Sequence, residues 1–532
     1  MKKSTCILLL SLACCWLAAQ CPAGDVTFST QGQIDSFQIN YPGCTDMPGS
    51  IRISGSDISN LLGLSTLDSI GGCLKIFDNP QLISLSGLKN LSYVGYCTEG
   101  SFFVTSFGLL IQNNAVLTSL AGLENLKSVR AGIAIDTNSS LSTLSGLNNL
   151  STVGTCTIQH PLGGSGLYSL QIVENKSLKA IDSLVKLDTL GILKIAGNDS
   201  LASLHGLGNL YFVEDLYIED NPSLPDFKGL ENLHTLGNFI IRYNTSLTGF
   251  NDLDSLKTLY GQLLVEFNDS LKDFSGLENL GTIGAGFYVG NNAILKDFSG
   301  LGNLQFIGAD FLVEYNGSLT NFQGLGNLKS IGCTFFFEEP SAIYTLRVRG
   351  NYSLVDFTGL ENLQSISCWT TFSPSYLWIS ENTSLQTIEG LGGSLDASTI
   401  LLIKDNSKLS TCEVPLVCNH VQDGGPASIS GNAPGCNSVA EVEAACVVSI
   451  EETSGGEPVV IFSPNPAGDF LQIQIDGNEK WDISLFDLQG RQMYRHSVSG
   501  SRIIEIEDWP AGVYALRAVS GGRAYTGRFV KE

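Results

Sequence analysis

The feature that most constrains this chain is a repeat of 23–24 residues that runs from Ile51 to Leu409. Each unit reads apolar-x-apolar-x-x-Asn-x-x-Leu-x-x-apolar-x-Gly-Leu-x-Asn-Leu-x-x-(Ile/Val)-Gly. A period of this length is typical of a solenoid, in which each unit buries its apolar side chains only against its neighbours. The first asparagine of the unit anchors the alignment at Asn79, Asn114, Asn138, Asn175, Asn198, Asn221, Asn244, Asn268, Asn292, Asn316, Asn351, Asn382 and Asn406.

The residue pattern within one unit predicts its local structure. Alternating apolar residues before the asparagine, as at Leu216-x-Ile218, predict a short strand with one inward face. The apolar residues that follow at three-residue spacing, Leu224 to Leu236, predict inward positions at successive bends. Glycine permits the tight corners. We predict that the asparagines are buried, bond the backbone of neighbouring turns and form a ladder, and are not ligand contacts.

The spacing after the anchor separates two repeat families. Standard leucine-rich repeats place leucine two residues after asparagine, whereas here it comes three residues after, as from Asn79 to Leu82. Together with Gly-Leu-x-Asn-Leu-x-x-Ile-Gly, this spacing resembles the receptor L domain of growth-factor receptors and secreted bacterial proteins. The resemblance covers about Cys21–Cys446. It implies a mainly β fold, a right-handed β-helix-like solenoid of 23–24-residue repeats, and says little about function.

The cysteines support a stacked, exported structure. Cys73 and Cys97 occupy the same phase on adjacent turns, as do Cys333 and Cys368, so each pair is expected to form a disulfide. The segments around Asp25 and Tyr41, and Cys436 to Cys446, resemble the end caps of the bacterial family members. In these caps we expect Cys21 to pair with Cys44, and pairing in an open order among Cys412, Cys418, Cys436 and Cys446. Cys156 has no assigned partner, and the cap spacings match no familiar zinc motif.

The first 20 residues indicate a secretory signal peptide. Lys2 and Lys3 precede an apolar run from Ile7 to Leu17. This run is too short to span a membrane, and no later segment is long and apolar enough. One alternative is a lipoprotein acylated on Cys21.

A different module begins near Val459. Alternating segments at 471–475, 481–486, 503–506, 513–516 and 525–530 predict a small antiparallel β-sandwich. The module's motifs resemble the type A C-terminal sorting domain of the type IX secretion system of Bacteroidota. The residues that carry the resemblance are Pro464, Asn465, Pro466, Gly490, Gly512, Tyr514 and Lys531. The resemblance implies handling by the type IX machinery and export to the outer-membrane surface or the extracellular space. The alternative is an ordinary binding sandwich.

The sequence therefore predicts six segments. They are a signal peptide (1–20), an N-terminal cap (21–50), the repeat solenoid (51–410), a disulfide-rich C-terminal cap (411–447), a linker (448–458) and the sorting domain (459–532). The net charge of −23 belongs to the solenoid, since residues 4–457 hold 43 acidic and 19 basic side chains, whereas 458–532 hold 9 and 8. An acidic chain of this kind is not expected to bind nucleic acid.

The sequence offers little for catalysis. Metal-protease, nucleophile-elbow and phosphate-loop motifs are absent, and the five histidines share no spacing. The adjacent acids Glu338 and Glu339 could serve acid–base chemistry, but one pair on a loop is weak support. We expect no enzyme, no bound metal and no cofactor.

Two surfaces are candidates for binding. Four insertions, at about 96–108, 155–169, 333–345 and 368–376, leave the repeat at the same corner, which often builds the binding face of a solenoid. They carry the candidate residues Phe102, Phe103, Phe335, Phe336 and Trp369; alternatively, these aromatics pack on the solenoid.

The second surface is the outward strand position four residues before each anchor. It is unusually apolar, which usually marks a contact surface; the alternatives are self-association or a shielded sheet face. Its members are Lys194, Tyr217, Ile240, Leu264, Tyr288, Leu312, Arg347 and Trp378.

These observations favour a secreted cell-surface repeat protein that acts as a non-catalytic binding or adhesion module for a protein or glycan. A carbohydrate-active or other extracellular enzyme is the first alternative. A structural surface spacer is the second.

Overall fold

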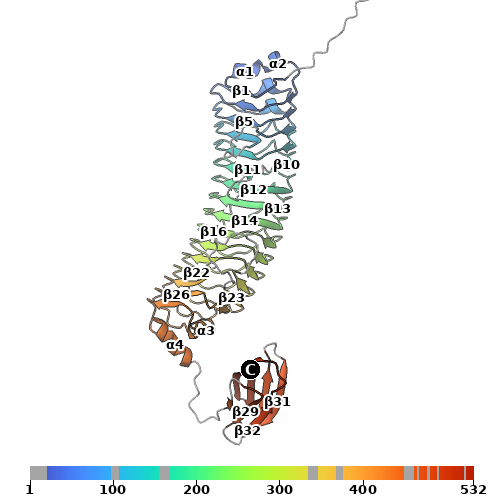
Figure 1. Cartoon of the computed structure of the whole chain (residues 1–532). Coiled ribbons are helices and arrows are strands. Elements are labelled where there is room, and N and C mark those ends of the chain that lie inside the picture. The colour runs from blue at the N-terminus through green and yellow to red at the C-terminus, as the bar shows by residue number, and fades with distance from the viewer. Residues whose placement is uncertain are drawn as a thin grey trace, which may run out of the picture. The chain divides into compact units, whose positions relative to one another are not determined.

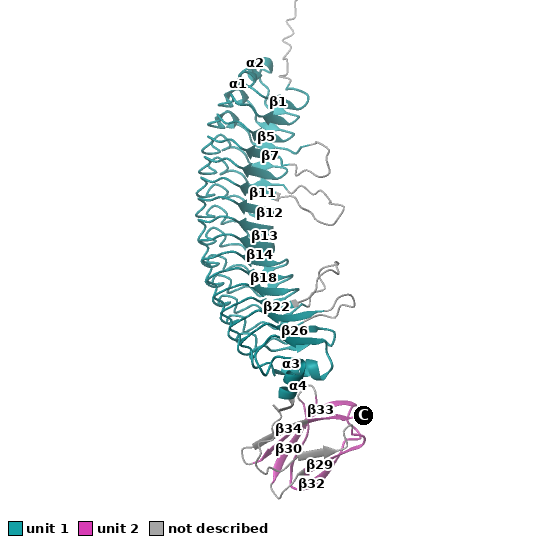
Figure 2. Ribbon diagram, turned by 90° about the vertical axis from the view of Figure 1, so that its left-hand side faces the viewer, with its two compact units in different colours: residues 1–446 teal, residues 447–532 magenta. Residues whose placement is uncertain are grey.

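The computed structural model describes residues 21–97, 107–154, 168–332, 345–366, 375–448, 460–463, 467–475, 480–487, 491–520 and 523–531. The chain forms two compact units, Met1–Cys446 and Val447–Glu532, which are described separately below (Figures 1 and 2). The predicted signal peptide, Cys156 and the expected Cys333–Cys368 pair lie outside the described residues.

Unit 1 is a parallel-strand β-solenoid of about 15 turns, as the repeat predicted. Figure 2 shows its long strands stacked along one side, and each pairs in parallel register with the strands of the turns before and after it. These long strands are β1 (Val26–Phe28), β3 (Ile51–Ile53), β5 (Leu74–Phe77), β7 (Leu109–Gln112), β9 (Ile133–Asp136), β11 (Tyr168–Val173), β12 (Thr189–Ala196), β13 (Phe212–Glu219), β14 (Thr235–Arg242), β16 (Leu263–Glu266), β18 (Phe287–Gly290), β20 (Phe311–Glu314), β22 (Thr345–Arg349), β24 (Tyr376–Ser380), β26 (Ile400–Lys404) and β27 (Ala427–Ser430).

A second, short strand forms in most turns where the (Ile/Val)-Gly motif ends the unit. These strands also stack in parallel. They are β2 (Asp46–Met47), β4 (Ser69–Ile70), β6 (Tyr93–Val94), β8 (Ser128–Val129), β10 (Thr152–Val153), β15 (Thr258–Leu259), β17 (Thr282–Ile283), β19 (Phe306–Ile307), β21 (Ser330–Ile331), β23 (Ser365–Ile366) and β25 (Ser394–Leu395).

The corner between the short and the long strand accounts for the variation in repeat length. In the 23-residue turns the two strands merge into one eight-residue strand, as in β12, β13 and β14. The 24-residue turns have one more residue at this corner and the two strands are separate, as β17 and β18 are by residues 284–286. The four insertions fall at this same corner, between β6 and β7, β10 and β11, β21 and β22, and β23 and β24. The prediction of one shared corner is therefore confirmed for the residues that flank the insertions.

The core of unit 1 consists of columns of identical positions from successive turns. Phe250, Phe274 and Phe298 stack with ring centroids 5.4 Å apart. A second column packs edge-on against them from the long strands, for example Phe287 against Phe298. Burying a large aromatic side chain contributes about 2–3 kcal/mol. Because each ring contacts its equivalents one turn away, the core is continuous along the solenoid.

The glycine of the Gly-Leu motif is required by the backbone. Gly276 has a φ of 106°, and a Cβ atom there would overlap the carbonyl oxygen of Phe250 in the turn before. Only glycine has both the conformational freedom and the small size that this corner demands.

Helices close the two ends of the solenoid, and the sequence did not predict them. At the N-terminal end are α1 (Gln31–Asp35) and α2 (Phe37–Asn40), followed by the 3-10 turns η1 (Leu62–Leu64) and η2 (Ser86–Leu88). Thr30 and Gln33 form a capping box at the start of α1. At the other end are α3 (Pro415–Gln422) and α4 (Val439–Val448). These helices are short, which explains the weak periodic signal.

Four disulfides bind the described ends of the solenoid. Cys21 is joined to Cys44 and Cys73 to Cys97, the pairs that the sequence predicted. In the C-terminal cap the order left open is Cys412–Cys436 and Cys418–Cys446. Because the Cys21 thiol is used in a disulfide, this structure does not fit the alternative of acylation at Cys21.

Unit 2 consists of two small antiparallel sheets around one core that includes Trp481, Tyr514 and Phe529. The first sheet holds β28 (Val460–Ser463), β29 (Phe470–Ile475) and β32 (Ser501–Glu505); the second holds β31 (Gln492–Val498), β30 (Trp481–Phe486), β33 (Gly512–Ser520) and β34 (Arg523–Lys531). The sequence missed β28 and β31. β31 lies at the edge of its sheet, and most of its side chains are exposed or half-buried, so the sequence shows no apolar alternation there.

Candidate binding surface

The anchoring asparagines form the predicted ladder inside the solenoid. Asn268, which is fully buried, donates from Nδ2 to the carbonyl oxygens of Ile241 at 3.1 Å and Glu266 at 3.0 Å. Its Oδ1 accepts the backbone N–H of Asn244 at 3.1 Å, and its own N–H donates to Asn292 Oδ1 at 3.0 Å. Since the donors and acceptor of each side chain are satisfied, the ladder is structural and is not a ligand site.

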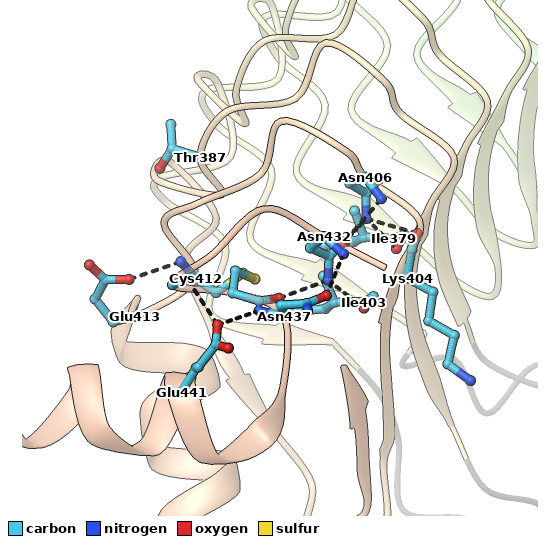
Figure 3. The surroundings of a disulfide bond; sticks show 12 residues. Ile379, Thr387, Ile403, Lys404, Asn406, Cys412, Glu413, Asn432, Asn437 and Glu441 are labelled. Atoms are coloured by element: carbon cyan, nitrogen blue, oxygen red, sulfur yellow. Dashed lines mark hydrogen bonds between the residues drawn. A yellow bond between two sulfur atoms is a disulfide. The ribbon is translucent and has the colours of Figure 1, made fainter. Parts of the chain in front are cut away.

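The ladder extends one turn beyond the last anchor found in the sequence. Asn432 accepts the N–H of Asn406 at 2.9 Å and donates to the carbonyl oxygens of Ile403 and Cys436, both at 2.9 Å (Figure 3). Asn437 then accepts the N–H of Asn432. The sequence of this turn keeps the first part of the repeat pattern, Ala427-x-Ile429-x-x-Asn432. It lacks the leucine that normally comes three residues after the asparagine.

Asparagines of the Gly-Leu-x-Asn-Leu motif form a second, peripheral row. Asn279 donates from Nδ2 to the carbonyl oxygen of Asp254 at 2.8 Å, and Asn303 does the same to Glu278 at 2.6 Å. Unlike the ladder, these side chains are exposed and each makes one bond to the turn before.

The candidate binding row lies on the outer face of the long strands, in continuous register from strand to strand. We call this the outer row. Tyr217 pairs with Ile240, Ile240 with Leu264, and the row continues through Tyr288 and Leu312. Toward the C-terminal end Leu312 pairs with Arg347, and Arg347 with Trp378.

The outer row is half-buried rather than freely exposed. Its aromatic and aliphatic members shield one another laterally, and Ile240 is only 2% exposed between Tyr217 and Leu264. Ile240 therefore presents almost no surface to a ligand, unlike the sequence expectation. A shielded sheet face, one of the alternatives raised by the sequence, describes this part of the row.

A second outer row, two residues before each ladder asparagine, shares the same face because strand side chains alternate. This row was not among the surfaces predicted from the sequence. It is rich in charges: Glu219 pairs with Arg242 at 3.0 Å and with Lys194 at 3.1 Å. Farther along, Arg349 pairs with Glu381 at 2.9 Å, and this bond raises the pKa of Arg349.

The middle of the outer face holds an unusual carboxylate. Burial raises the pKa of Glu266; the positive charge of Arg242 opposes this effect, and the negative charge of Glu314 adds to it. Between the two glutamates lies Gly290, which has no side chain. Burial also raises the pKa of Tyr288, which lies in the same strand as Gly290.

The C-terminal part of the outer face differs in its polar groups. The guanidinium of Arg347 lies over the ring of Trp378, with 5.6 Å between its carbon and the ring centroid. Its Nη2 donates to Glu314 at 2.8 Å. Three buried groups here, Arg347 Nε, Trp378 Nε1 and Ser380 Oγ, have no hydrogen-bond partner.

Other predicted candidates cannot be placed. Phe102, Phe103, Phe335, Phe336, Trp369 and the acidic pair Glu338–Glu339 lie outside the described residues. Within the described ranges, no group of three or more His, Cys, Asp or Glu side chains could hold a metal ion.

Two family models match the chain. Residues 43–148 match the receptor L domain, and residues 461–532 match the secretion system C-terminal sorting domain. The chain therefore contains an early segment similar to the receptor L domain and a terminal segment similar to the sorting domain. The first match covers the early turns of the solenoid, and the structure shows the same turn continuing to the C-terminal cap. No curated protein matches the sequence.

The match to the sorting domain implies export to the cell surface or the extracellular space, with handling by the type IX secretion machinery. Of the motif residues, Gly512 begins β33, Tyr514 is buried and donates to the Pro510 carbonyl oxygen at 2.7 Å, and Lys531 ends β34. Pro464, Asn465, Pro466 and Gly490 lie outside the described residues. Among the helices described, none has the length and apolar character to cross a membrane.

Proposed function

We propose that this exported protein is a non-catalytic binding or adhesion module that engages an extracellular ligand with the outer face of its long strands. The observation that supports this most is the outer row from Leu264 to Trp378. It is continuous and in register, and it is more apolar than a solvated face requires. The two outer rows together combine aromatic, aliphatic and charged side chains, which suits a protein or a glycan.

Glycan-array and pull-down binding by the purified protein tests the proposal. The variant Leu312→Glu places a charge in the outer row, because Leu312 is half-buried on the outward side of β20. The matched control is Ile294→Glu, since Ile294 is 41% exposed on the turn after the ladder asparagine and lies off this face. We expect Leu312→Glu to reduce binding at least tenfold and the control to leave it unchanged. Equal binding by both variants would refute the role of this face.

A carbohydrate-active enzyme is the alternative, and Glu266 is the observation that favours it. An inverting glycosidase needs a protonated acid and an ionised base several ångströms apart. Glu266 has a raised pKa. Glu314 lies two strands from Glu266, about 10 Å along the stack, and is ion-paired with Arg347. Release of reducing sugars from any polysaccharide by the purified protein, abolished in Glu266→Gln, would replace the binding proposal by this one.

A further inference from the structure

The C-terminal part of the outer face gathers hydrogen-bond donors that have no partner. Arg347 Nε, Trp378 Nε1 and Ser380 Oγ are all buried, and Ser380 is only 3% exposed. Buried polar groups are nearly always paired, and an unpaired one costs about 1–3 kcal/mol. These three donors lie beside the partly exposed side chains of Arg347 and Trp378, so a ligand that shifts these side chains would supply the missing acceptors.

The three donors share one small area. Arg347 in β22 and Trp378 in β24 are direct cross-strand partners. Ser380 lies two residues beyond Trp378 on the same strand, and therefore on the same face. The bond from Arg347 Nη2 to Glu314 fixes the guanidinium and leaves Nε for another acceptor.

Basic side chains border this area, and that of Arg349 is ion-paired with Glu381. Ser380 pairs across the sheet with Arg349 on one side and Lys404 on the other. Figure 3 shows the Lys404 side chain extending away from the ladder asparagine Asn406. Arginine, tryptophan and lysine side chains can only donate hydrogen bonds, so the complementary group is an anion with acceptor oxygens, such as a carboxylate.

The rest of the area fits a sugar better than a peptide. Tyr376 and Trp378 on β24 and Leu402 on β26 present half-buried aromatic and aliphatic surface, which can cover the C–H face of a sugar ring. Strand β24 is paired on both sides, with β22 and β26, so an acidic peptide could not add to it as a strand.

We propose that Arg347, Trp378, Ser380 and Lys404 form a subsite for a carboxylate-bearing sugar of an acidic polysaccharide. This assignment rests on the proposed function of the outer face and names the ligand class. Salt should weaken the interaction, because the site is half-exposed and its charges are screened.

Polygalacturonate and alginate are the test ligands, with neutral dextran for comparison, in calorimetry with the full-length protein. Removing one charge-assisted donor should weaken binding about tenfold or more, so we expect this for Arg347→Gln and Lys404→Gln. Trp378→Phe keeps an aromatic face but removes Nε1–H together with the five-membered part of the indole, and should weaken binding several-fold. The matched control is Lys272→Gln, which removes one positive charge from an exposed position on the turn after the ladder asparagine Asn268, off the outer face; its affinity should not change. Circular dichroism checks that each variant is folded.

Four outcomes would overturn the subsite, and the last of them rejects the proposed binding function as well. In the first, all variants bind polyuronate with equal affinity. In the second, poly-glutamate binds as tightly as polyuronate and with the same sensitivity to Trp378→Phe. In the third, a neutral glycan or a protein binds in a manner sensitive to Leu312→Glu while polyuronates do not bind; this outcome retains the proposed binding function and rejects only the ligand class. Binding of no ligand would reject both.

Discussion

The two units are stabilised in different ways, and the difference shows what a repeat provides. In unit 1 a column of fully buried asparagines runs through the apolar core, and each is bonded to the turns on both sides. The described residues of unit 2 form no such column; its two small antiparallel sheets share one apolar core. A polar group can be buried at low cost in unit 1 because stacking supplies the same partner at every turn.

The consequences for stability also differ. Stability of a solenoid is approximately a sum of terms between neighbouring turns, so a defect in one turn weakens the contacts on both sides. A small two-sheet domain depends on a single core and is correspondingly marginal. The following experiments test this contrast, from the largest expected effect to the smallest.

Deletion of residues 459–532 should abolish export, because these residues include the match to the sorting domain. The solenoid should keep its own thermal transition, since none of the described residues of unit 2 belongs to the solenoid core. Immunoblots of periplasmic and surface fractions, with calorimetry of the truncated protein, measure both effects. Unchanged surface display would contradict the assignment of the module, and loss of the solenoid's transition would contradict the separation of the units.

Replacement of a ladder asparagine should strongly destabilise unit 1. Asn268→Ala leaves the Asn244 N–H and the carbonyl oxygens of Ile241 and Glu266 without their buried partner. We expect a loss of about 4 kcal/mol in the free energy of unfolding, measured by urea denaturation.

The peripheral row provides the matched control for the ladder. Asn279 is exposed and makes one bond to the turn before. Asn279→Ala should therefore cost about 1 kcal/mol or less. Similar losses for the two variants would show that burial of the ladder does not matter.

The corner glycine should be nearly as sensitive as the ladder. Gly276→Ala forces a side chain into a left-handed conformation and against the Phe250 carbonyl, at a cost of about 3 kcal/mol. Gly302→Ala is the control, because a Cβ atom there meets nothing within 4 Å, and its effect should stay within about 0.5 kcal/mol. Denaturation curves of the two variants measure the free energy of unfolding. If Gly276→Ala had no effect, the backbone at this corner would be able to relax around a Cβ atom.

The smallest effect is expected in unit 2. Tyr514→Phe removes the hydrogen bond to the Pro510 carbonyl oxygen while keeping the ring packed against Phe529. The transition of unit 2 should lose about 1 kcal/mol, and that of unit 1 should not change. Differential scanning calorimetry separates the two transitions, and a simultaneous shift of both would argue against independent units.

The sequence by itself determined the architecture, because a solenoid repeats one local pattern. The spacing of Asn268, Leu271 and Gly276 defines a turn, and its recurrence places equivalent residues one above another. The ladder, the corner glycines and the Cys73–Cys97 bridge all follow from phase alone. The strands of unit 2 were partly predicted for a similar reason, since apolar alternation identifies strands with one buried face.

Only the tertiary structure decided what the outer face exposes. Ile240 and Leu264 occupy equivalent sequence positions, yet Ile240 is buried and Leu264 only half-buried, because their neighbours on adjacent turns differ. Likewise, nothing in the local sequence of Ser380 places it between Arg349 and Lys404, which lie 31 and 24 residues away along the chain. Lateral contacts across a whole turn set burial, charge pairing and unpaired donors, and those contacts exist only once the turns are stacked.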